Sequence, residues 1–178
     1  MLRVILLYGV IGGLVVALPW VFGLHALVPH EYGEVAGYAV MIVALTTVFI
    51  AIKDYRDRVL GGVIRFLPAL GIGLGITAVA GVFYVGGFEL YQLMSGTNYM
   101  DQYISYAIEA ERAKGVTGAQ LEAFVANMES MRTMMANPAV RMASSFVIDF
   151  LPVGTLISVI SALLLRNSRF MPARQAAA

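Results

Sequence analysis

Long apolar runs alternate with short polar stretches along the chain, and this pattern predicts four membrane-spanning helices. The apolar runs cover residues 4–24, 35–52, 66–93 and 146–165. Each has close to, or more than, the roughly 20 residues with which an α-helix crosses a bilayer. A signal peptide is the alternative interpretation of the first run, but that run is longer than the usual apolar core of about 7–15 residues and no clear cleavage site follows it.

Residues 95–137, between the third and fourth runs, differ from the rest because charged residues are interspersed with apolar ones at helical spacing. Asn98 is placed to cap a first helix, and Thr117 to cap a second, with Gln120 at the capping-box position. The second helix presents one apolar face, formed by Leu121, Phe124, Val125, Met128, Met131 and Met135. We therefore expect an extracytoplasmic helical hairpin that either lies on the bilayer surface or caps the bundle.

A charged stretch between the second and third runs sets the expected orientation of the chain. The segment from Lys53 to Arg65 is predicted to be a loop, because so dense a charged patch is too costly in hydrocarbon. Loops rich in Lys and Arg stay on the cytoplasmic side, so four spans place both termini there too. The same side then also holds Arg3, Arg166, Arg169 and Arg174. The basic residues left outside, all in or beside the hairpin, are Arg112, Lys114, Arg132 and Arg141.

The composition agrees with an all-α integral membrane protein that forms a single domain over residues 1–178. Hydrophobic residues make up 60% of the chain and charged residues only 13%, whereas a soluble domain carries about 25% charged residues. The formal net charge of +1 argues against nucleic acid as a partner. Since the chain has no cysteine, disulfides and thiolate metal sites are excluded, and neither a metal nor another cofactor is expected.

Small residues in the first and third runs indicate close helix packing. Gly71 and Gly75 form a GxxxG spacing in the third run, and Gly9 and Gly13 give the first run a similar patch. Such glycines let two helix backbones approach closely. Packing within the bundle is the favoured interpretation, because this spacing is common in membrane helices, and formation of a homo-oligomer is the alternative.

Two stretches of the chain carry recognisable motifs. The first is FIAIKDYRD at residues 49–57, followed by the pair Gly61-Gly62. The second is DFLPVG at residues 149–154, preceded by the pair Asn137-Pro138 and continued by LIS at 156–158 and SAL at 161–163. Together they resemble the signatures of a bacterial family, the domain-of-unknown-function family numbered 4199. The resemblance implies a four-helix inner-membrane protein and names no activity. Asp149 departs from the family pattern, which has glutamate there, so the acid is kept but its reach is shorter.

Asp149 is the leading candidate for a functional residue, because acids within membrane segments are costly and often functional. It lies near the start of the fourth run, three residues before Pro152. Glu89, near the end of the third run, and His25, after the first, are expected at a similar depth, so the three residues together suggest a proton or cation site. The simpler interpretation, which we favour, is that Asp149 caps a helix beginning at Phe150, with Pro152 in its first turn.

The charged stretch also offers a surface for anionic lipid headgroups. Lys53, Arg56, Arg58 and Arg65 are predicted to face the lipid of the cytoplasmic leaflet, where each basic residue contributes about 1 kcal/mol of attraction. A signal for topology alone is the alternative interpretation.

The expected function is that of a non-catalytic structural or accessory component of the bacterial inner membrane. Its partners are then the lipid bilayer and either other copies of the chain or a larger membrane complex. A small transporter or channel that uses Asp149 is the alternative, although the inner halves of the first and last runs offer few polar residues beyond Ser158 and Ser161. An enzyme is the least favoured class, because the sequence shows no pair of nucleophile and base.

Overall fold

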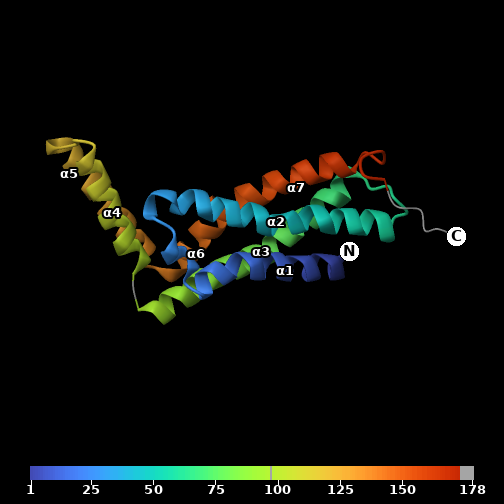
Figure 1. Ribbon diagram of the computed structural model, residues 1–178, viewed down its shortest axis with the longest axis horizontal. Coiled ribbons are helices and arrows are strands. Elements are labelled where there is room, and N and C mark those ends of the chain that lie inside the picture. Colours follow the sequence, from blue (N-terminus) through green and yellow to red (C-terminus); the bar gives the residue numbers. More distant parts are fainter. Residues whose placement is uncertain (97, 173–178) are drawn as a thin grey trace.

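The computed structural model describes residues 1–96 and 98–172, and within these ranges it is built from helices, turns and short loops alone. Arg174, which we predicted to be cytoplasmic, lies outside the described residues. Figure 1 shows a bundle of long helices from which a helical hairpin projects at one end, while the first helix starts and the last helix ends at the other. We call these the hairpin end and the terminal end of the bundle.

Four long helical segments form the bundle. They are α1 (Leu2–Val21), α2 (Gly33–Arg58), α3 (Phe66–Ser95) and a continuous segment that runs through α6 (Pro138–Ser144), η3 (Ser145–Phe150) and α7 (Leu151–Leu165). Two short 3₁₀ turns, η1 (Leu24–Leu27) and η2 (His30–Tyr32), join α1 to α2. All four segments are long and apolar enough to cross a membrane, which confirms the predicted all-α class and the four apolar spans.

The second helix is longer than predicted. α2 continues to Arg58 instead of ending at residue 52, so the charged stretch from Lys53 begins as helix and only the residues after Arg58 form a loop. Lys53 pairs with Asp57, and Arg58 pairs with Asp54, each at 2.6 Å. Both pairs join residues four apart, a spacing that brings opposite charges together on one helix face and stabilises the helix.

The fourth segment also begins earlier than predicted, at Pro138 instead of residue 146. Asn137 caps it, because its side-chain oxygen accepts a hydrogen bond of 3.0 Å from the Ala139 amide. Pro138 then occupies the first helical position, where its missing amide hydrogen has no intrahelical partner to lose. The Asn137-Pro138 pair therefore starts the last segment as well as ending the hairpin.

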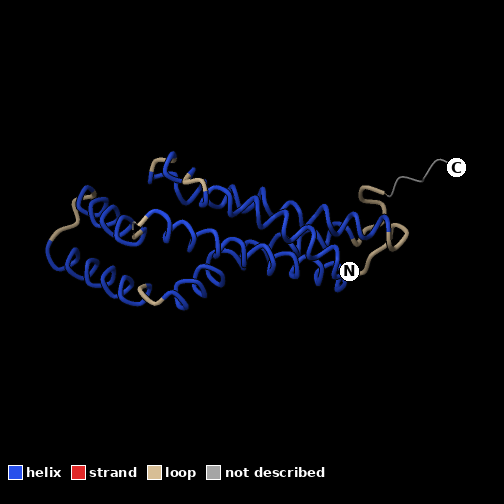
Figure 2. The backbone as a smooth tube through the Cα atoms, turned by 90° about the horizontal axis from the view of Figure 1, so that it is seen from below, coloured by secondary structure: helices blue, strands red, loops and turns tan. Residues whose placement is uncertain are grey.

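The hairpin consists of α4 (Tyr99–Ala113) and α5 (Gly118–Met135), and it extends beyond the end of the bundle in both views (Figure 1, Figure 2). An ion pair of 2.6 Å between Arg132 of α5 and Asp101 of α4 joins the two helices. The six apolar residues predicted for one face of α5 are half-buried, as expected for a face that packs against α4. The two helices of the hairpin therefore pack against each other.

The two helix caps predicted for the hairpin have different outcomes. Asn98 caps α4, since its side-chain oxygen accepts a hydrogen bond of 3.1 Å from the Met100 amide. Thr117 takes the N-cap position of α5, but its side chain makes no capping hydrogen bond. The predicted capping box with Gln120 is therefore wrong. The following residue, Gly118, has a φ of +60°, a left-handed conformation that favours glycine.

A ladder of small residues joins α1 to α3. In each contact of this ladder, a glycine on one helix faces a side chain of the other helix. The four contacts, or rungs, are Ile5 with Gly75, Gly9 with Val79, Gly13 with Phe83, and Ala17 with Gly87. A Cβ atom added at Gly9 or at Gly13 would lie 2.6 Å from the side chain opposite. Since both helices advance by four residues per rung, α1 and α3 run parallel at very close range.

Gly71 does not belong to this ladder, contrary to the packing role expected for it. A Cβ atom added at Gly71 would meet nothing within 4 Å. Continuing the ladder by one rung would set Gly71 opposite Met1, which precedes α1 and is 58% exposed. Gly75 is thus the member of the GxxxG pair that packs against α1.

A second close contact joins α3 to α7 in the middle of the bundle. Gly73 faces Ser158 and Gly154 faces Thr77, so each helix offers a glycine to the hydroxyl residue of the other. The Thr77 hydroxyl donates to the Gly73 carbonyl at 3.0 Å, and the Ser158 hydroxyl donates to the Gly154 carbonyl at 2.6 Å. The two hydroxyl oxygens lie 3.4 Å apart and both residues are fully buried. These polar groups are therefore satisfied within the bundle, as hydrocarbon surroundings require.

Candidate functional site

The structure places Asp149 in a π-helical turn in the interior of the fourth segment. The turn, η3, covers Ser145–Phe150, and its wider winding is seen where the Leu151 amide donates to the Phe146 carbonyl, five residues back. Pro152 follows at once and has no amide hydrogen with which to continue the regular helix. Single π-helical turns within α-helices occur frequently at functional sites, so the turn itself adds weight to Asp149.

The expectation that Asp149 caps a helix is wrong. The helix does not begin at Phe150, because α6, η3 and α7 form one continuous segment whose cap is Asn137. The residue at the N-cap position of α7 is Phe150, and it makes no side-chain capping bond. The half-buried Asp149 carboxylate has no hydrogen bond or ion pair with another residue of the described ranges, and its electrostatic neighbours are Tyr84 of α3 and Glu34 of α2.

Glu89 forms an ion pair with Arg141. The Arg141 guanidinium donates to both carboxylate oxygens of Glu89, at 2.8 and 2.6 Å, and to the Met135 carbonyl at 3.0 Å. The two side chains are only 17–18% exposed. Glu89 lies near the end of α3 and Arg141 lies in α6, so the ion pair joins two segments of the bundle with the strongest type of side-chain hydrogen bond. Since Met135 ends α5, the bond from Arg141 to its carbonyl ties the end of the hairpin to this pair.

His25 belongs to an aromatic cluster at the hairpin end. Its ring lies 4.6 Å from the Trp20 ring and 4.3 Å from the Tyr91 ring, and Tyr99 is close to both His25 and Trp20. Burial lowers the pKa of His25, and a contact of Nδ1 with the Pro19 carbonyl only partly offsets this effect. The cluster therefore favours a neutral imidazole that packs as an aromatic ring.

The three polar residues that we predicted to lie together thus occupy three separate environments. Asp149 lies beside Tyr84 and Glu34, Glu89 is held by Arg141, and His25 packs among rings. No hydrogen bond or ion pair joins any two of the three in the part of the chain that the structure describes. What remains chemically available is the Asp149 carboxylate, which can gain or lose a proton within an apolar span.

Arg56 is not a lipid-facing residue, contrary to its predicted role. Its side chain is fully buried at the terminal end of the bundle. Nη1 donates to the Phe170 carbonyl at 3.0 Å and more weakly to the Leu165 carbonyl at 3.4 Å, and Nη2 donates to the Met171 carbonyl at 2.6 Å. Nε donates to Asp57 at 2.6 Å. Arg56 therefore binds the carbonyl of Leu165, one of the last carbonyls of α7, which lack partners within the helix, and two carbonyls of the turns that follow.

The other residues of the predicted basic surface lie where lipid or solvent can reach them. Arg58 has 80% of its side chain exposed and Lys53 has 29%. Arg65 is exposed and precedes α3. Since Lys53 and Arg58 are each paired with an aspartate, Arg65 is the member of this group with no ion pair to another described residue.

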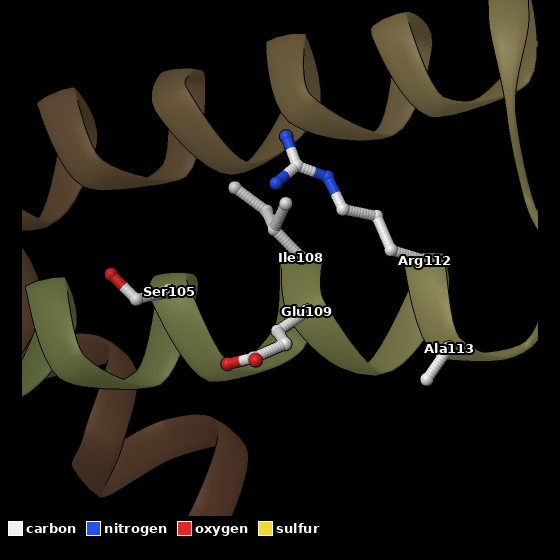
Figure 3. Close-up of a pocket in the computed structure, with 5 residues that line it drawn as sticks. All are labelled: Ser105, Ile108, Glu109, Arg112 and Ala113. Carbon is white, nitrogen blue, oxygen red and sulfur yellow. The ribbon is translucent and has the colours of Figure 1, made fainter.

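A hollow of about 800 Å³ lies along α4 (Figure 3). Its lining residues all come from this one helix and include Ser105, Glu109 and Arg112. Figure 3 shows the Arg112 side chain extending toward the neighbouring helix while Glu109 extends to the opposite side. These groups do not converge on a common point, so the hollow offers no arrangement for chemistry.

Arg141 was not predicted as a partner for Glu89. Arg141 appeared only among the basic residues left outside, although a signal was present. Electrostatics favours pairing of an arginine and a glutamate expected at the same end of neighbouring spans, because a charge near hydrocarbon is stabilised by its opposite. Tyr84, the buried neighbour of Asp149, gives no such signal, since a tyrosine in an apolar run is indistinguishable from a packing residue.

The comparison with protein-family models finds a match over most of the chain. The family described as "Protein of unknown function (DUF4199)" matches residues 6–167. No curated protein and no solved structure matches the chain. The match covers both motif stretches, and it confirms the resemblance seen in the sequence.

Proposed function

Since this chain belongs to the DUF4199 family, whose description names no activity, we propose from the structure that it is a non-catalytic structural or accessory component of the bacterial inner membrane. In this role the bundle is a rigid anchor and the hairpin is the part presented outside the bilayer. Its partners are the bilayer lipids, with anionic headgroups near Arg58 and Arg65, and other copies of the chain or other membrane proteins.

The observation that carries this proposal is the interlocked interior of the bundle. α3 packs against α1 through the ladder of small residues and against α7 through the Gly73–Ser158 and Gly154–Thr77 contacts. The buried hydroxyls of Thr77 and Ser158 are bonded to their own helices and so are not directed toward a passing solute. Interiors this closely packed resist deformation, which suits an anchor better than a gate.

A proton or cation transporter is the second candidate, and Asp149 is the observation that favours it. An acid in an apolar span, within a π-helical turn and beside the buried Tyr84, is the arrangement in which a carboxylate takes up and releases protons. This candidate requires the α3–α7 contact to loosen during transport, because Gly154 and Ser158 lie on the same helix as Asp149.

A flux measurement separates the two candidates. Liposomes that contain the full chain and an internal pH-sensitive dye are given a proton gradient, and the rate of internal pH change is compared with that of empty liposomes. For the structural role we expect equal rates for the wild type and for Asp149→Asn. A faster wild-type rate that Asp149→Asn reduces to the level of empty liposomes would replace the structural role with the transport role.

The proposed orientation places both termini and the loop after α2 in the cytoplasm and the hairpin outside. It is supported by the position of Arg58, Arg65 and Arg166 at the terminal end, since basic residues favour the cytoplasmic side. We expect a reporter that is active only in the cytoplasm to be active when fused at Gly62 and inactive when fused at Gly115. Activity at Gly115 would contradict this orientation.

A further inference from the structure

A second pocket, of about 400 Å³, lies where the hairpin joins the bundle. The end of α3, the start of α4, the end of α5 and the start of α6 all contribute to its wall. Its polar lining includes Glu89, Gln92, Arg132 and Arg141. Unlike the hollow along α4, this pocket therefore gathers polar groups from several elements, which is the usual construction of a ligand site.

Gln92 gives the first indication that something binds in this pocket. Its side-chain nitrogen is buried, and among the described residues it is the one buried side-chain nitrogen or oxygen atom with no hydrogen-bond partner. Buried polar atoms in folded proteins are almost always hydrogen-bonded, so such an exception calls for an acceptor. Gln92 also lines the pocket, so a small rotation of its side-chain amide would let an acceptor bound there complete this bond.

The neighbouring charges define the chemistry of that acceptor. Both oxygens of Glu89 already accept hydrogen bonds from Arg141. Arg141 also binds the Met135 carbonyl, and Arg132 binds Asp101 and Glu129. A guanidinium group has five N–H donors, so each arginine keeps donors in addition to those used. The unused capacity of the pocket wall therefore consists mainly of donors, two of them cationic, and this combination selects anionic oxygen.

We propose that this pocket binds a phosphate group at the root of the hairpin. Phosphate supplies several anionic oxygens that can accept from Gln92, Arg132 and Arg141 together. Leu93, which lines the pocket, and the next residue of α3, Met94, are 82% and 68% exposed. Donors for phosphate next to exposed apolar side chains fit the phosphodiester of a lipid headgroup. A free phosphate or a soluble phosphate ester offers the same chemistry to the polar groups.

The test uses the full chain in dodecyl maltoside and two probes. Inorganic phosphate represents the soluble source and short-chain dihexanoyl phosphatidylglycerol represents the lipid source, and the shift of the thermal unfolding midpoint with probe concentration gives an apparent affinity. We expect one of the two probes to raise the midpoint, and the responding probe identifies the source. Gln92→Leu should weaken the apparent affinity by about tenfold or more, because a hydrogen bond to a charged group is lost.

Two further variants make the result specific to the pocket. Gln92→Glu should abolish the response, since it replaces the amide donor with a carboxylate that, unlike Glu89, has no arginine bonded to both of its oxygens and would repel phosphate. Gln102→Leu, a change at an exposed glutamine of α4, should respond like the wild type. The proposal is overturned if neither probe shifts the midpoint of the wild type, or if both Gln92 variants respond as the wild type does.

Discussion

Replacing Gly154 with valine is expected to disrupt the bundle, because the new side chain would occupy the space of Thr77. A Cβ atom at position 154 alone would overlap the Thr77 methyl group and approach its hydroxyl oxygen to 2.7 Å. Thr77 is fully buried and bonded to the Gly73 carbonyl, so it has no room to turn away. Overpacking of this kind typically destabilises a protein by about 1–3 kcal/mol, occasionally more, and we expect the upper part of that range or beyond. Thermal unfolding of the detergent-solubilised chain measures the loss.

Gly71→Val is the matched control for this prediction. It adds the same side chain to α3, the helix that faces Gly154, at a glycine with nothing within 4 Å of an added Cβ atom. We expect it to change the stability by no more than about 0.5 kcal/mol. If both variants unfolded at the wild-type temperature, the α3–α7 contact would not be as close as described, and the argument for a rigid anchor would lose its basis.

The four spans were predictable because a bilayer imposes a simple constraint on sequence. Only a helix satisfies every backbone group of a single crossing segment in hydrocarbon, so each apolar run of sufficient length had to be a helix. Helix boundaries carry no such constraint. The extension of α2 to Arg58 depends on the pairs Lys53–Asp57 and Arg58–Asp54. The i,i+4 spacing of these pairs can be seen in the sequence, but we interpreted the same charges as evidence for a loop.

Which glycines touch a neighbour was predictable only in part, because contact depends on how two helices are aligned. Gly9 and Gly75 fall on rungs of the α1–α3 ladder, while Gly71 falls one rung below its start. The spacing of glycines within one helix is the same in both cases and cannot reveal the offset between helices. The Gly154–Thr77 contact was missed for this reason, since the two residues are far apart in the sequence.

The interpretation of Asp149 failed because a local rule was applied without knowing the continuity of the helix. An acid before a proline-containing run resembles an N-cap. The chain instead continues as helix from Pro138, and the turn that precedes Pro152 in this helix is π-helical. Hydrophobicity falls near residues 141–145, so the pattern alone suggested that the segment starts after them.

Replacing Arg56 with leucine is expected to release the chain after α7 and to destabilise the bundle. The guanidinium donates to three backbone carbonyls, of Leu165, Phe170 and Met171, and to Asp57. Leucine fills part of the volume but leaves these acceptors without their donor in a buried place. Removing one member of a buried charged network typically destabilises a protein by about 3–5 kcal/mol. The loss is measured by thermal unfolding in detergent and by the rate at which trypsin cleaves after Arg166 and Arg169, which should rise when the segment is released.

Arg58→Leu is the control for this second prediction, because it removes an equal charge two residues away. Arg58 is 80% exposed and pairs only with Asp54 on its own helix, and exposed pairs of this kind contribute little to stability. We therefore expect wild-type unfolding and a wild-type rate of cleavage at Arg166 and Arg169. Equal behaviour of the two variants would mean that the positive charge of this stretch, and not the buried hydrogen bonds of Arg56, determines how the end of α7 is held. If only Arg56→Leu loses stability, the buried hydrogen bonds of Arg56 hold the end of α7. Arg56 would then be a packing residue of the fold, although it lies in a basic stretch of the kind that sets topology.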